Sequence, residues 1–207
     1  MSKRRVVITG LGAVSSVGNT AEETWQAVKA GKSGASHITL FDAADFPVQI
    51  AAEVKDFSLD AYNVNHKLSR KMSRFAKFLL GAGIQAVNDS GLSSETLAFG
   101  KTGIVTGIGI GLSDGLDAGY RKYFDPNAGV NRLPPLTAPL SLNNEASANV
   151  SMYFGIKGPS WTISTACASG SDAIGLGMDM IRSGRIDVCL AGGTDANITG
   201  FNIGCYE

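Results

Sequence analysis

Short runs of β-branched and apolar residues alternate along the chain with longer stretches in which apolar residues recur every three or four positions. The first pattern is typical of strands and the second of amphipathic helices, so their alternation predicts a layered α/β fold. Strands are expected at residues 5–9, 102–106, 161–165 and 186–191. Helices are expected at residues 21–30, 71–88, 143–154 and 169–182. Prolines at 134, 135 and 139 predict a surface excursion over residues 123–140.

The first helix has the clearest start signal. Thr20 is followed three residues later by Glu23, which is the capping-box pattern, and Gly31 provides a stop. Trp25 and Val28 fall on one face of this helix.

Charge and composition narrow the class of protein. The 207 residues carry 18 Lys and Arg against 18 Asp and Glu, so the formal net charge is zero. This balance argues against a general nucleic-acid or membrane-surface binder. No apolar run approaches the roughly 18 residues that a membrane-spanning helix needs, and residues 1–5 show no signal-peptide pattern. We therefore expect a cytoplasmic protein without nucleic-acid or membrane partners.

The chain has three cysteines, Cys167, Cys189 and Cys205, and two histidines, His37 and His66. An odd number of cysteines without C-x-x-C spacing supports neither a disulfide framework nor a zinc site. No metal and no cofactor are expected. Packing roles are favoured for Cys189 and Cys205, and surface positions without a catalytic role for both histidines.

Cys167 has a different setting, because it lies between an expected strand and a helix that begins with small residues, in the run 165–170 (TACASG). Small neighbours allow the tight turn of a nucleophile elbow. A helix N-terminus, with free N–H groups and a partial positive charge, favours a thiolate. Nucleophilic catalysis at Cys167 is one reading, and a small buried residue without chemistry is the other.

Two further patterns allow alternative readings. Glycine clusters at 10–12 and 107–111 resemble nucleotide-binding loops, but neither completes G-x-G-x-x-G, so tight turns explain them better. Basic residues recur at helical spacing opposite apolar ones between 66 and 77, which predicts an amphipathic helix. This basic face is either solvated or a docking site for an acidic or phosphate-bearing partner. Its members are Lys67, Arg70, Lys71, Arg74 and Lys77.

Several motifs in order along the chain are similar to those of the β-ketoacyl-acyl carrier protein synthases, the elongating type II condensing enzymes. They are residues 5–15 (RVVITGLGAVS), 31–34 (GKSG), 41–57, 155–159 (GIKGP), 165–170 (TACASG) and 191–194 (AGGT). The resemblance spans essentially residues 1–207, and it identifies them as one domain, the N-terminal half of this family.

The resemblance implies a thiolase-like fold of layered α-β-α-β-α type, of which this chain is most of the first half. It also implies a homodimer in which the strand leading to Cys167 pairs across the interface. Cys167 aligns with the nucleophile that accepts an acyl chain from acyl carrier protein, and its backbone N–H with an oxyanion donor. Malonyl-acyl carrier protein then loses carbon dioxide, and the resulting carbanion attacks the acyl thioester in fatty acid elongation.

Other positions carry over in the same way. Ile108 aligns with a residue that limits the depth of the acyl pocket, and Tyr206 with a pocket phenylalanine. Lys67, Arg70 and Lys71 resemble the basic positions that meet acyl carrier protein.

The chain also departs from the family pattern. The family's catalytic histidines lie in a C-terminal half outside these residues, so we expect the chain alone not to catalyse condensation. Asp195 stands where many relatives have glutamate, and Ile110 is inserted among the usual glycines. A polyketide-type ketosynthase, a non-catalytic chain-length partner subunit, and a thiolase acting on coenzyme A esters are the alternatives.

Overall fold

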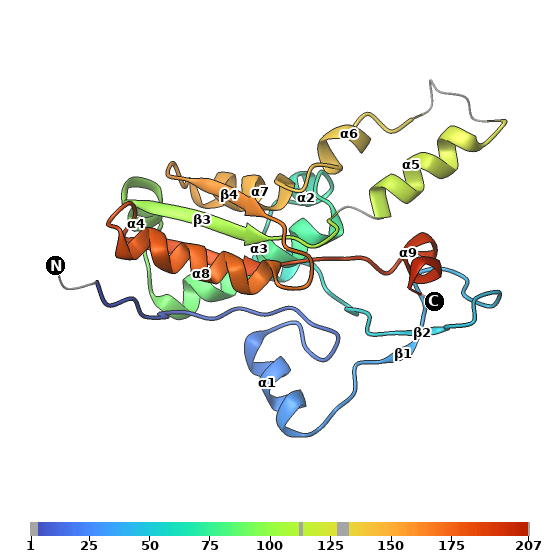
Figure 1. Cartoon of the computed structure of the whole chain (residues 1–207), viewed down its shortest axis with the longest axis horizontal. Coiled ribbons are helices and arrows are strands. Elements are labelled where there is room, and N and C mark those ends of the chain that lie inside the picture. The colour runs from blue at the N-terminus through green and yellow to red at the C-terminus, as the bar shows by residue number, and fades with distance from the viewer. Residues whose placement is uncertain (1–3, 112–113, 128–132, 207) are drawn as a thin grey trace.

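The centre of the molecule is a parallel sheet of three strands, seen in a computed structural model that describes residues 4–111, 114–127 and 133–206. The middle strand is β3 (Thr102–Gly107), flanked by β4 (Ser160–Ile163) and β5 (Val188–Gly193) in the order β4-β3-β5. Strands β3 and β4 are labelled in Figure 1. Val105 in β3 pairs with Trp161 on one side and Ala191 on the other. Since the strands are parallel, their carboxyl ends meet at one edge of the sheet.

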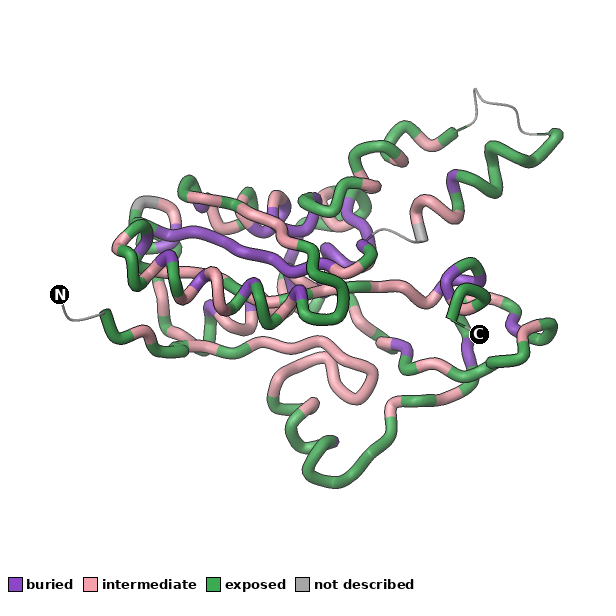
Figure 2. Tube along the Cα trace, viewed as in Figure 1, coloured by how far each residue is buried: buried purple, intermediate pink, exposed green. Residues whose placement is uncertain are grey.

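Helices cover both faces of this sheet. Helix α8 (Ser169–Arg182) packs on β3 and β5, whereas α7 (Glu145–Phe154) packs on β3 and β4 and is itself covered by α3 (Arg74–Ser90). Neighbouring residues of β3 point to opposite faces, so Ile104 joins the α3–α7 side of the core and Val105 joins the α8 side. The whole of β3 is buried (Figure 2), as expected for a strand between two helical layers.

The remaining elements surround this layered core. Helix α1 (Ala21–Lys29) begins at the expected capping box, in which Thr20 Oγ1 accepts from Glu23 N–H and the Glu23 carboxylate accepts from Thr20 N–H. Among the described residues no helix is long and apolar enough to cross a bilayer. The other elements are β1 (Ser36–His37) and β2 (Ile50–Ala51), which pair antiparallel, and the helices α1 (Ala21–Lys29), η1 (Leu59–Tyr62), α2 (His66–Ser69), α4 (Ser94–Phe99), α5 (Asp114–Phe124), α6 (Thr137–Leu140) and α9 (Gly200–Cys205).

Most of the sequence predictions of structure are confirmed with shifts of a few residues. The α/β class, the three later strands and the helices that became α1, α3, α7 and α8 are all present. The surface excursion is also present, because the end of α5 and the short α6 lie beyond the layered core, away from the sheet (Figure 1). Its residues 128–132 lie outside the described residues.

The expected strand at residues 5–9 is wrong, because residues 4–13 form no strand. The segment that follows lies on α3, where Leu11 N–H donates to Asp89 and Ala13 N–H to Gln85. A β-branched run favours extended backbone, but it does not provide a partner strand.

The amphipathic helix expected over residues 66–77 is not continuous. The chain forms α2, breaks after it, and restarts at Arg74, because Ser73 caps α3 by accepting from Ala76 N–H. Ser73 also donates to the buried carboxylate of Glu145 at the start of α7. Helical spacing predicted the basic and apolar faces, but it did not reveal this capping serine.

The apolar side of α1 is largely exposed in this structure. Trp25 and Val28 are each 57% exposed, and Ala27 is the buried residue of the helix. Lys29 lies over the ring of Trp25, with its Nζ 5.6 Å from the ring centroid.

Candidate active site around Cys167

Cys167 stands in the turn between β4 and α8, as the sequence predicts, and it is exposed. The preceding residue, Ala166, has φ of +54°, the left-handed region that residues with a side chain rarely adopt. Such a conformation costs on the order of 1–3 kcal/mol and persists where surrounding contacts hold it. The turn therefore has the strained, exposed geometry of a nucleophile elbow.

Ser169, the first residue of α8, ties this turn together. Its Oγ accepts from Thr165 N–H at 2.8 Å and donates to Ala166 O at 2.7 Å, with Ile108 O as a further acceptor at 3.3 Å. Thr165 Oγ1 donates to Asp172 at 2.5 Å. The residues on either side of Cys167 are thus bonded to α8 and to the end of β3.

Glycines bring the start of α8 against the ends of two strands. A Cβ on Gly107, the last residue of β3, would lie 2.0 Å from the carbonyl oxygen of Ser169. A Cβ on Gly193, the last residue of β5, would lie 2.8 Å from the Cα of Gly170. Only glycine permits such close backbone approach, so these residues fix where Cys167 lies above the sheet.

The glycine-rich loop after β3 is held by a carboxylate from the loop after β5. Asp195 accepts from the N–H groups of Gly109 at 2.8 Å, Ile110 at 3.1 Å and Gly111 at 2.9 Å. Successive N–H groups of this kind form an anion-binding nest. Because Asp195 already occupies the nest, these N–H groups are not free for a nucleotide phosphate, and the dinucleotide reading loses its support.

The other two cysteines differ from each other. Cys189 is half-buried in β5, and burial raises the pKa of its thiol to about 11. Cys205 is exposed at the end of α9, which contradicts the packing role expected for it. The packing role followed from the general tendency of cysteine to be buried, which does not show what covers a particular position. Both histidines are exposed, as expected.

The two expected acyl-pocket residues differ in their surroundings. Ile108 is fully buried in the core between the sheet and α3, whereas Tyr206 is 69% exposed beside α9. Neither of them, nor Cys167, lines the cavity that includes Leu40 and Asp195 or the one that includes His37 and Asp42.

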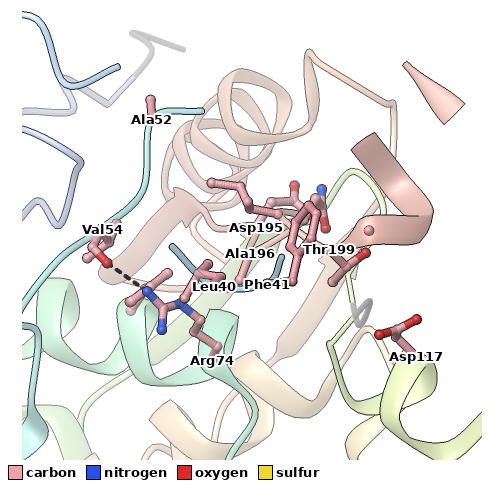
Figure 3. Close-up of a pocket in the computed structure, with 13 residues that line it drawn as sticks. Leu40, Phe41, Ala52, Val54, Arg74, Asp117, Asp195, Ala196 and Thr199 are labelled. Carbon is pink, nitrogen blue, oxygen red and sulfur yellow. Dashed lines mark hydrogen bonds between the residues drawn. The ribbon is translucent and has the colours of Figure 1, made fainter. Parts of the chain in front are cut away.

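The cavity lined by Leu40, Val54 and Asp195 has a volume of about 450 Å³ and is mostly apolar (Figure 3). Arg74 reaches it from α3 and donates to Val54 O at 2.7 Å, while Asp117 and Asp195 contribute carboxylates to its wall. Arg74 therefore turns away from the basic face that helical spacing predicted for it.

Three of the five residues of the predicted basic face are exposed. They are Lys67, Arg70 and Lys71, which lie in α2 and in the break that follows it. The expected docking residues are thus accessible, although they do not share one continuous helix with Arg74 and Lys77.

Sequence reasoning missed two polar residues. One is Ser169, which holds the Cys167 turn, and the other is Glu145, which accepts from Ser73 at the start of α3. The sequence pattern shows Ser169 only as one of several small residues and gives no signal for Glu145, which is buried and accepts from Asn149 Nδ2 at 2.7 Å. A serine two positions after the cysteine, at the start of a helix, was the available signal for Ser169.

The sequence matches a known protein family and several of its members. Residues 3–207 match the family model described as "Beta-ketoacyl synthase, N-terminal domain". A relative from Coxiella burnetii named 3-oxoacyl-[acyl-carrier-protein] synthase 2 is 41% identical over 206 residues, which covers 100% of this chain and 49% of the relative. The chain thus spans about half the length of the curated relatives it matches.

Solved structures agree with this match. One titled the ishigamide ketosynthase/chain length factor has a TM-score of 0.92 at 30% identity, covering 99% of this chain and 50% of that chain. Another, a type II polyketide acyl-carrier protein in complex with its ketosynthase, has a TM-score of 0.83 at 24% identity, covering 99% and 48%. These likenesses confirm the expected thiolase-like α/β fold class.

Proposed function

Since the chain belongs to the β-ketoacyl synthase family through its N-terminal domain, we propose that the protein containing it is a 3-oxoacyl-acyl carrier protein synthase of fatty acid elongation. The observation that carries the proposal is the position of Cys167 on a strained turn at the start of α8. In this proposal its sulfur attacks an acyl thioester, takes the acyl group and releases the carrier thiol.

The chemistry of the turn supports this role. The helix N-terminus favours the thiolate that attacks, and the Cys167 N–H is proposed to donate to the oxyanion that forms on the acyl carbonyl. In the second half-reaction, decarboxylation of malonyl-acyl carrier protein supplies a carbanion that attacks the Cys167 thioester. The carbon–sulfur bond breaks, the thiolate returns to Cys167, and a β-ketoacyl product leaves.

Residues 1–207 contain the proposed nucleophile, and their two histidines, His37 and His66, lie in β1 and α2, outside the turn that holds Cys167. We therefore propose that condensation requires a further half that supplies the decarboxylating groups, and that residues 1–207 alone do not condense. Full-length protein given acyl- and malonyl-acyl carrier protein should release carbon dioxide and form β-ketoacyl-acyl carrier protein. Failure to form either product would contradict the proposal.

Acyl carrier protein is the proposed partner, and Lys67, Arg70 and Lys71 are its proposed docking residues. Exposed charge pairs contribute about 0.2–1 kcal/mol each, so we expect the double variant Lys67→Ala/Lys71→Ala to raise the KM for acyl-acyl carrier protein about fivefold with kcat little changed. The matched control is Lys32→Ala/Lys101→Ala, which removes two other exposed lysines. Equal KM values for the two double variants would argue against this docking surface.

A homodimer is also proposed. Strand β4 leads to Cys167 and lies at the edge of the three-stranded sheet, so its outer hydrogen-bonding groups are free to pair with the same strand of a second copy. We also propose that the reaction takes place in the cytoplasm, as expected for a protein similar to the relatives named 3-oxoacyl-[acyl-carrier-protein] synthase 2.

The polyketide-type alternative draws on the ketosynthase/chain length factor structure, at 30% identity. The fatty acid reading is favoured because the curated relative at 41% identity is named 3-oxoacyl-[acyl-carrier-protein] synthase 2. A non-catalytic chain-length partner is disfavoured because Cys167 is present and exposed at the elbow.

A further inference from the structure

Asp195 links two loops at the carboxyl edge of the sheet. Its Oδ2 accepts from Gly109 N–H, and its Oδ1 accepts from Ile110 and Gly111 N–H and from Asn197 Nδ2. A carboxylate suits this arrangement, because both of its oxygens accept hydrogen bonds.

The other side of the same loop is bonded to the Cys167 turn. Ser164 Oγ donates to Gly109 O at 3.3 Å, and Ser169 Oγ lies 3.3 Å from Ile108 O. The loop and the turn are also in close contact, because a Cβ on Gly109 would lie 3.4 Å from Ala166 O and 3.0 Å from Asp195 Oδ2. The loop is therefore held between Asp195 and the residues that flank Cys167.

We propose that Asp195 is a positioning residue for Cys167, which holds loop 109–111 against the elbow and thereby keeps the strained turn in its reactive shape. This inference rests on the proposed role of Cys167 as the acyl acceptor. Asp195 does not touch the sulfur in this account and acts through the loop.

The strain at Ala166 explains why a clamp is needed. A residue with positive φ relaxes to an ordinary conformation unless its surroundings hold it. When the carboxylate is lost, the three N–H groups lose their acceptors, the loop moves away from Ser164 and Ala166, and the turn is free to relax. The thiol of Cys167 then moves away from its place at the helix N-terminus.

The test is the rate at which iodoacetamide alkylates Cys167 relative to Cys205 in the full-length protein, measured by peptide mass spectrometry. Both thiols are exposed, but Cys167 precedes the N-terminus of α8 and Cys205 lies at the C-terminus of α9. We expect Cys167 to react about fivefold faster or more in the unaltered protein. In Asp195→Asn we expect that ratio to fall about fivefold and deuterium exchange of the peptide covering 109–111 to rise.

Glu53→Gln is the matched control for a merely structural effect. Glu53 is a buried carboxylate that accepts from the N–H groups of Thr39 and Leu40 and from the Thr39 hydroxyl. None of these donors belongs to loop 109–111 or to the Cys167 turn. Burial acts to raise its pKa, but these hydrogen bonds and nearby Lys55 hold the pKa below its ordinary value. Its replacement should lower the melting temperature while leaving the Cys167:Cys205 ratio unchanged.

The outcomes separate the two claims. Equal alkylation of Cys167 and Cys205 in the unaltered protein would overturn the proposed function and this inference with it. Preferential alkylation of Cys167 that survives in Asp195→Asn, or that falls as much in Glu53→Gln, would overturn the role of Asp195 alone.

Discussion

Replacement of Cys167 by alanine is expected to lower the condensation rate of the full-length protein by at least about a thousandfold, because no other group can form the acyl-enzyme thioester. The side chain is exposed and packs against no core cluster, so the free energy of unfolding should change by less than about 0.5 kcal/mol. The measurement is β-ketoacyl-acyl carrier protein formation together with a denaturant melt.

Cys205→Ala is the control for that experiment, since it removes a second exposed thiol at the end of α9. It should retain the unaltered rate. Condensation that persists at that rate in Cys167→Ala would show that the sulfur at this position is not the acyl acceptor.

Gly107→Ala is expected to lower the free energy of unfolding by about 3 kcal/mol and to reduce acylation of Cys167 about a hundredfold. The new Cβ would lie 2.0 Å from the carbonyl oxygen and 2.2 Å from the carbonyl carbon of Ser169, both backbone atoms. Helix α8 must therefore shift along the sheet, and Cys167 moves with it. Urea unfolding and acylation kinetics measure the two effects separately.

Gly192→Ala is the matched control, because Gly192 lies in the adjacent strand opposite Thr106 and a Cβ there meets nothing within 4 Å. Its stability should change by less than about 1 kcal/mol. A similar loss in both variants would mean that β propensity, and not the close approach of α8, limits substitution here.

The order of strands and helices could be predicted from the sequence, because the apolar residues of each core element recur with the spacing typical of a strand or of a helix. The buried run 102–106 and the small-residue helix after Cys167 were both predicted within two residues of their bounds. The turn that holds Cys167 could be predicted for the same reason, since it is the junction of two such elements.

Contacts between distant residues could not be predicted in this way. Asp195 and the loop 109–111 are over eighty residues apart in sequence. No pattern within either segment indicates that the carboxylate accepts hydrogen bonds from the loop. The break before Arg74 depends on Ser73 meeting Glu145 from another helix. The strand expected at residues 5–9 does not form for a related reason. A strand needs a partner strand, and the pattern within one segment does not show whether a partner lies beside it.

The central claim is that the sulfur of Cys167 accepts the acyl chain, and transfer from acyl-acyl carrier protein to the full-length protein tests it directly. Peptide mass spectrometry should find the added acyl mass on Cys167 at least about tenfold more than on Cys205. Cys189 should stay unmodified, because burial raises the pKa of its thiol to about 11. Acyl mass found mainly on Cys205, or on none of the three cysteines, would contradict the account.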